Sequence, residues 1–213
     1  DKRFPQALGL RLSSIASVNN RGVGGQVSAD IAARQGGAPA LITLTGNQIP
    51  ATGSVQVTSY STDLLFNSGN SGSISLTGTL AGVPGTLSGN NVAGRNNAVY
   101  TFTRTSAGAV TACPAGTPFI PDLGTATRSR VQIFTYGRND GVNTSAINNI
   151  LAALAASVAH QTAYAPRYLV GGELAAPGES LTGFNAVRDA LAAAHPGRFV
   201  DLNAPPSVEE MAR

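Results

Sequence analysis

The residues best suited to chemistry lie in the segment Thr135-Tyr-Gly-Arg-Asn-Asp-Gly141, between a predicted strand and a predicted helix. In an open α/β sheet, ligands bind at the carboxyl ends of the strands, where this loop would lie. An amide such as that of Asn139, held in a glycine turn, is a fixed donor for a developing oxyanion. On the residues alone, the alternative is an ordinary turn in which Asn139 and Asp140 satisfy backbone groups or cap the helix.

A second glycine-rich loop, Gly22-Val-Gly-Gly-Gln26, also separates a predicted strand from a predicted helix. Its backbone N–H groups could bind an anion or an oxyanion at the N-terminus of that helix. The loop is not Gly-x-Gly-x-x-Gly, and no acidic residue follows at the expected distance, so a dinucleotide site is not supported. By itself this loop is a weak indication of function.

The remaining candidates have simpler interpretations. Gly178-Glu-Ser-Leu-Thr182 imitates a nucleophile motif, but Ser180 is more simply explained as a helix cap. His160 and His195 each end a predicted helix, where an imidazole complements the last carbonyls. Cys113 lies in a polar segment with no histidine near it in sequence, which is typical of an unreactive thiol. Two distant histidines do not make a metal site, and no cofactor motif is present.

The elements that must position these loops fall into three stretches. Residues 1–37 indicate helix, short strand, glycine loop and helix, and residues 128–213 alternate strands with helices. Such alternation predicts parallel crossovers and a sheet covered on both faces. Residues 38–127 carry only four charged side chains and many short β-forming runs between turn residues. We therefore expect an α/β domain of residues 1–37 and 128–213, interrupted by an antiparallel β module of residues 38–127.

Composition excludes several classes of protein. Charged residues are 12% of the 213, the formal net charge is +3, and the basic residues are scattered, so nucleic acid is not an implied partner. No apolar run approaches the roughly 18 residues of a membrane span. A single cysteine excludes an internal disulfide framework. The chain lacks an initiator Met and stops within a capping box, Ser207 and Glu210, so we expect a fragment of a longer protein.

Taken together, the two loops resemble conserved blocks of the SGNH (GDSL-type) hydrolases. Residues 18–28 resemble the second block of that family, and Gly137-Arg-Asn-Asp140 matches its third block, Gly-x-Asn-Asp. The resemblance implies an α/β, flavodoxin-like three-layer sandwich with a parallel sheet. It also implies that the Gly25 N–H and the Asn139 amide form an oxyanion hole, to which the nucleophilic serine adds a third donor. The implied activity is that of a serine esterase or deacylase that works through an acyl-enzyme, without metal or cofactor.

Two blocks of that family are missing. Gly-Asp-Ser should precede residue 1 and Asp-x-x-His should follow the last residue, so this chain alone is expected to be inactive. The implied substrate is a small ester or an acylated carbohydrate, in a secreted, cell-surface or phage protein. The β module would lie beside the site, and its aromatic residues are either an apolar wall for sugar or core: Tyr60, Phe66, Tyr100 and Phe102. The alternative is a carbohydrate- or surface-binding protein on a degenerate scaffold.

Overall fold

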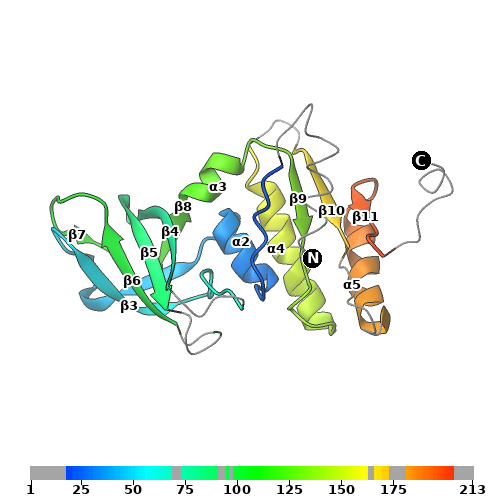
Figure 1. Cartoon of the computed structure of the whole chain (residues 1–213), viewed down its shortest axis with the longest axis horizontal. Helices are drawn as coiled ribbons and strands as arrows, with labels where there is room; N and C mark the ends of the chain where they lie inside the picture. Colours follow the sequence, from blue (N-terminus) through cyan, green and yellow to red (C-terminus); the bar gives the residue numbers. More distant parts are fainter. Residues whose placement is uncertain are drawn as a thin grey trace.

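The computed structural model describes residues 18–68, 73–90, 95, 98–162, 166–172 and 181–203. A β-barrel forms one end of the molecule, and a group of helices with a small parallel sheet forms the other (Figure 1). Helix α3 (Asp122–Thr127) lies between the two parts. None of the helices in the described segments is both long enough and apolar enough to cross a membrane.

Six antiparallel strands close the barrel, in the order β1-β3-β6-β5-β4-β8. Strand β6 shows why these residues form a barrel wall, because Tyr100 and Phe102 are buried while Thr101 and Thr103 are more exposed. Two short strands, β2 and β7, pair with each other separately. The bounds are β1 (Leu41–Leu44), β2 (Gln48–Ile49), β3 (Ser54–Tyr60), β4 (Ser73–Leu80), β5 (Val83–Asn90), β6 (Val99–Arg104), β7 (Thr111–Ala112) and β8 (Thr117–Pro121), with a 3-10 turn η1 (Thr45–Asn47) after β1.

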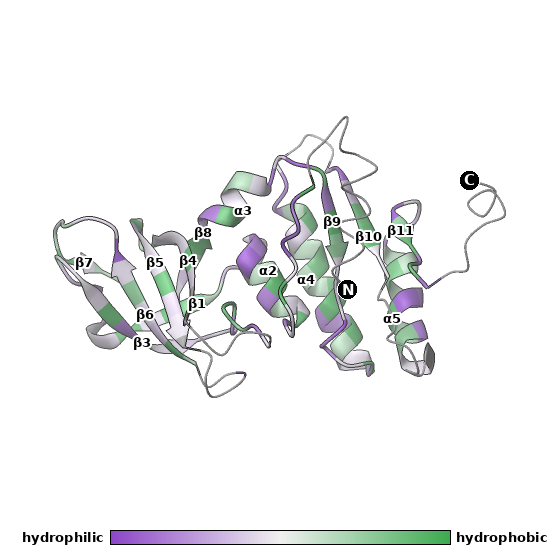
Figure 2. Ribbon diagram, viewed as in Figure 1, coloured by the Kyte–Doolittle hydropathy of each residue, from purple (hydrophilic) through white to green (hydrophobic). Residues whose placement is uncertain are grey.

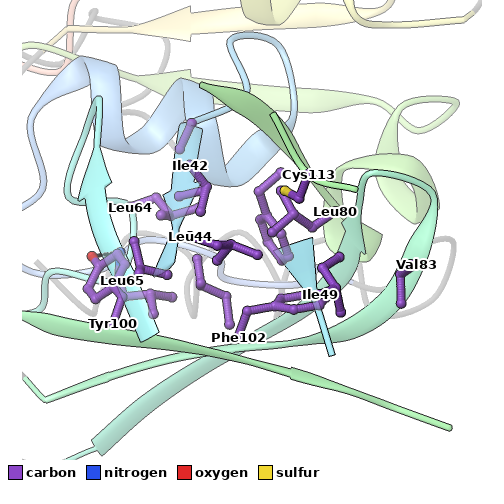
Figure 3. Packing of buried hydrophobic residues seen from close by; sticks show 14 of the residues in the cluster. Ile42, Leu44, Ile49, Leu64, Leu65, Leu80, Val83, Tyr100, Phe102 and Cys113 are labelled. Carbon is purple, nitrogen blue, oxygen red and sulfur yellow. Dashed lines mark hydrogen bonds between the residues drawn. The ribbon is translucent and has the colours of Figure 1, made fainter. Parts of the chain in front are cut away.

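The interior of the barrel is filled by large apolar side chains (Figure 3). Tyr100 lies over Gly89 of the neighbouring strand, where an added Cβ would come within 2.7 Å of its ring. Cys113 is fully buried in the same core. The barrel therefore has a core of its own, and most of the aromatic residues of residues 38–127 belong to it rather than to an external surface.

At the other end, three parallel strands form a sheet in the order β11-β10-β9. Their bounds are β9 (Gln132–Thr135), β10 (Tyr168–Gly171) and β11 (Phe199–Val200), and the helices are α2 (Ser28–Gln35), α4 (Thr144–Ala159) and α5 (Leu181–Ala194). Phe134 and Val170 of the sheet share one buried cluster with apolar residues of all three helices. Figure 2 shows hydrophobic residues on β9, β10 and α4, which pack together in this cluster.

The predicted fold class, a flavodoxin-like three-layer sandwich with a parallel sheet, is wrong. The described chain is mostly antiparallel β structure, and its largest sheet is the closed barrel. Among the described residues three strands are parallel, and their second face presents Ile133, Leu169 and Val200 with 40–42% of their surface exposed. Because α2, α4 and α5 share a single core cluster with the sheet, this part has two layers within the described residues.

The two parts of the molecule meet closely at the end of α2. A Cβ on Gly124, in α3, would lie 3.1 Å from the α-carbon of Gly36, so the chain enters and leaves the barrel at neighbouring points. This arrangement requires glycine because the two backbones leave no room for a side chain. The division of the chain into domains at residues 37 and 128 stays a prediction. The expected helix near the N-terminus, Ser180 and the capping box at Ser207 lie outside the described residues.

Candidate functional site

The structure brings the two loops singled out in the sequence into direct contact. Residues 136–141, here the asparagine loop, follow β9; residues 22–27, the glycine loop, precede α2. The Asn139 side chain donates from Nδ2 to the carbonyl oxygen of Gln26 over 2.9 Å. The Asp140 carboxylate accepts hydrogen bonds from the backbone N–H and the hydroxyl of Ser28, each at 2.9 Å. Residues more than 100 positions apart therefore form one site.

Asp140 caps a helix, but not the helix that follows it in sequence. Its partner Ser28 is the first residue of α2, and the unpaired N–H groups at that helix end favour a negative charge. Helix α4 is instead capped by Asn143, whose side chain accepts from the N–H of Ala146 at 2.9 Å. Burial raises the pKa of Asp140 above its ordinary value, and the Ser28 hydrogen bonds offset part of that increase.

Two donors are left over at the contact between the loops. The backbone N–H of Gly25 and the second N–H of the Asn139 amide donate to no acceptor among the described residues. Asn139 is an exposed residue and Gly25 a partly exposed one, so neither residue is enclosed in a core. Gly25 has φ +81°, a left-handed conformation that glycine adopts without steric cost. Such fixed donors can stabilise negative charge on an oxygen atom.

The barrel contributes residues to this site that the sequence did not reveal. The carboxylate of Asp30, which is 1% exposed, pairs with Arg95 and accepts from the Thr62 hydroxyl at 2.6 Å. Arg95 also donates to the carbonyl oxygen of Gly25. The available signal was the scarcity of charge, because Arg95 is one of four charged residues between positions 38 and 127.

Neither histidine of the chain belongs to the site. Helix α4 starts beside the carboxyl end of β9 and runs back, so His160 at its end lies toward the opposite edge of the sheet. His195 contacts the hydroxyl of Tyr168, the first residue of β10, through Nδ1 at 3.2 Å. Burial lowers the pKa of both imidazoles. Both histidines therefore lie at helix ends, and neither is placed to act as a general base beside Asn139.

The aromatic residues considered as a sugar platform divide into two groups. Tyr100 and Phe102 are fully buried in the barrel core, and Tyr60 stacks on Tyr100 with ring centroids 4.4 Å apart. Phe66 differs, since a Cβ on Gly25 would lie 2.7 Å from its ring. Only Phe66 of this set therefore lies against the glycine loop. In the described part of the chain, no three His, Cys, Asp or Glu side chains are grouped as metal ligands.

Comparison with known proteins adds no relative, because no family model, curated protein or solved structure matches this chain.

The partly buried carboxyl of Asp140 should give the free energy of unfolding a specific pH dependence. Its pKa is raised above 3.8 in the folded chain, so the folded state binds this proton more tightly than the unfolded state. Its contribution to stability is fully present below that value and is lost as the pH rises through the raised pKa. The Asp140→Asn variant carries an amide that does not titrate. Compared with this variant, the wild type should therefore lose stability as the pH rises from 3.8 through the raised pKa of Asp140.

Urea unfolding of both proteins from about pH 3 to about pH 7 measures that difference directly. The other carboxyl groups contribute equally to the free energy of unfolding of both proteins to first order, so their contributions cancel in the difference. Asp189→Asn, at an exposed position of α5, controls for the loss of one negative charge. A wild-type stability that rises with pH relative to Asp140→Asn would mean that Ser28 and Arg95 outweigh burial.

Proposed function

We propose that this chain provides the oxyanion hole of a serine esterase or deacylase. The observation that supports the proposal is the contact between the two loops, in which Asn139 donates to the carbonyl oxygen of Gln26, the residue that follows Gly25. The asparagine loop is held by Asp140 on the N-terminus of α2, and the glycine loop is held by Asn139 itself. The proposal depends on this local geometry and not on the class of fold.

The donors would act on the tetrahedral intermediate of ester cleavage. A serine hydroxyl attacks the ester carbonyl, and the carbonyl oxygen becomes an anion that accepts hydrogen bonds from Gly25 and Asn139. Collapse releases the alcohol and leaves an acyl-enzyme, which water then hydrolyses. The general base would be a histidine other than His160 and His195, and the proposal places the serine and that histidine outside the described residues.

The surroundings of the site favour a polar, uncharged substrate such as an acylated carbohydrate. The barrel reaches the glycine loop through Ser68, whose backbone N–H donates to the Gly24 carbonyl at 2.9 Å, and through the ring of Phe66. An aromatic ring beside polar groups is a common surface for sugar. Arg95 stacks on the same ring, with its guanidinium carbon 4.2 Å from the ring centroid.

The test is hydrolysis of p-nitrophenyl acetate and p-nitrophenyl butyrate by the full-length protein that contains this chain. We expect turnover, and covalent labelling of one serine by a fluorophosphonate, with residues 1–213 alone as the inactive control. A full-length protein that neither hydrolyses these esters nor becomes labelled would overturn the proposal. Binding of unmodified carbohydrate by such an inactive protein would instead support the alternative of a binding protein.

A further inference from the structure

Contacts from the barrel fix the direction of the peptide groups in the glycine loop. The N–H of Ser68 donates to the carbonyl oxygen of Gly24 at 2.9 Å. In a trans peptide group the C=O and the N–H point in opposite directions. The peptide between Gly24 and Gly25 therefore directs its N–H, the proposed oxyanion donor, away from Ser68. A residue of the barrel sets the direction of this donor.

The next peptide group is held in the same way by Arg95, which donates to the carbonyl oxygen of Gly25. A second nitrogen of the same guanidinium pairs with the buried carboxylate of Asp30 in α2. A planar fork of donors can bind two acceptors at once in a fixed geometry, which an ammonium group cannot reproduce. Arg95 thus joins the barrel, the glycine loop and the start of α2.

Packing prevents the loop from turning away from these hydrogen bonds. The ring of Phe66 lies beneath the Arg95 guanidinium and against Gly25. On the other side, the buried Gln26 donates through Nε2 to the carbonyl oxygen of Leu64 at 3.0 Å and accepts from Arg34 Nε at 3.0 Å. Backbone and side-chain hydrogen bonds therefore hold the loop on the barrel up to and including Gln26, the residue whose carbonyl oxygen accepts from Asn139.

From this geometry we propose that Arg95 is a positioning residue for the oxyanion hole. The barrel would then influence kcat as well as the binding of substrate. The inference rests on the proposed function. Loss of the Arg95 fork frees the Gly25–Gln26 peptide to rotate, which misdirects the adjacent Gly25 N–H. The Gln26 carbonyl that accepts from Asn139 moves with the same segment. The hydrogen bonds from both donors to the oxyanion would then be poorly aligned and weaker.

The test compares Arg95→Lys and Arg95→Ala in the full-length protein with p-nitrophenyl acetate. We expect kcat to fall about 10- to 100-fold in both variants with little change in KM, since small misplacements of catalytic groups have effects of this size. The lysine can still pair with Asp30, so Arg95→Lys should recover the melting temperature but not kcat. Arg104→Lys is the matched control, because Arg104 also donates to backbone carbonyls, those of Pro50 and Ala109, elsewhere on the barrel.

The outcomes separate this inference from the proposed function. If Arg95→Lys keeps kcat within about two-fold of wild type while Asn139→Ala loses it, Arg95 has no positioning role and the esterase proposal stands. If Arg95→Lys recovers kcat and melting temperature together, the role of Arg95 is charge pairing alone, which also overturns the inference. A wild-type protein without ester hydrolysis would overturn both. If Arg95→Ala does not fold, Arg95→Lys alone still decides between these results.

Discussion

Asn139→Ala is expected to lower kcat on a small acetyl or butyryl ester by about 100- to 1000-fold in the full-length protein, which is the usual effect of removing one oxyanion donor. The donor meets full negative charge only as the tetrahedral intermediate forms, so KM should change little. Asn139→Asp should be at least as harmful, because a carboxylate would repel both the oxyanion and the carbonyl oxygen of Gln26.

Stability must be measured beside turnover, because the same amide also joins the two loops. Asn139 is exposed, so the lost hydrogen bond to Gln26 should cost no more than about 1 kcal/mol. Asn148→Ala, on the exposed side of α4, is the matched control and should leave kcat unchanged. If Asn139→Ala keeps near-full kcat, or loses it only by unfolding, Asn139 is a turn residue and the oxyanion assignment is wrong.

The sequence identified the two loops because each carries a local signal. Glycines followed by a helix mark a turn, and an Asn-Asp pair after a strand marks a cap or a donor. Position along the chain does not say which helix a residue caps. Asp140 lies closest in sequence to α4, yet it caps α2, since its partner Ser28 lies 112 positions earlier. The sequence therefore indicates that Asp140 can cap a helix, but not which helix it caps.

The fold class could not be derived in the same way. Alternating strands and helices at both ends of the chain suggested a parallel sheet covered on both faces, but Ile133 and Leu169 are exposed on one face while Phe134 and Val170 are buried on the other. Strands of four residues are too short for their pattern to distinguish one covered face from two.

Closure of the barrel was equally hidden. It requires β1 to pair with β8, whose partners Leu41 and Pro118 are far apart in sequence. Arg95 was missed for the same reason, because Asp30 and Gly25 lie 65 and 70 positions before it. Local patterns predict elements and turns, whereas pairings between distant segments depend on the packing of the whole chain.

Gly25→Ala is expected to be the most destabilising of the small substitutions in the glycine loop. At φ +81° an alanine adopts a left-handed conformation, which costs about 1–2 kcal/mol. Its Cβ would also lie 2.7 Å from a ring carbon of Phe66 and 2.7 Å from the Cβ of Ser68. Forcing a methyl group into a packed site adds typically about 1–3 kcal/mol, for a total of about 2–5 kcal/mol in the free energy of unfolding.

Gly53 separates the two contributions, because it has φ +76° and nothing within 4 Å of an added Cβ. Urea unfolding of residues 1–213 should therefore show Gly53→Ala losing only the conformational part, about 1–2 kcal/mol. In a Phe66→Ala background the penalty of Gly25→Ala should shrink but stay above that of Gly53→Ala, since the ring is gone while the Cβ of Ser68 still lies 2.7 Å from the methyl group. If the penalty at Gly25 equals that at Gly53 from the start, the Phe66 ring does not pack on the loop. The barrel would then not hold Gly25 in the conformation that the oxyanion hole requires.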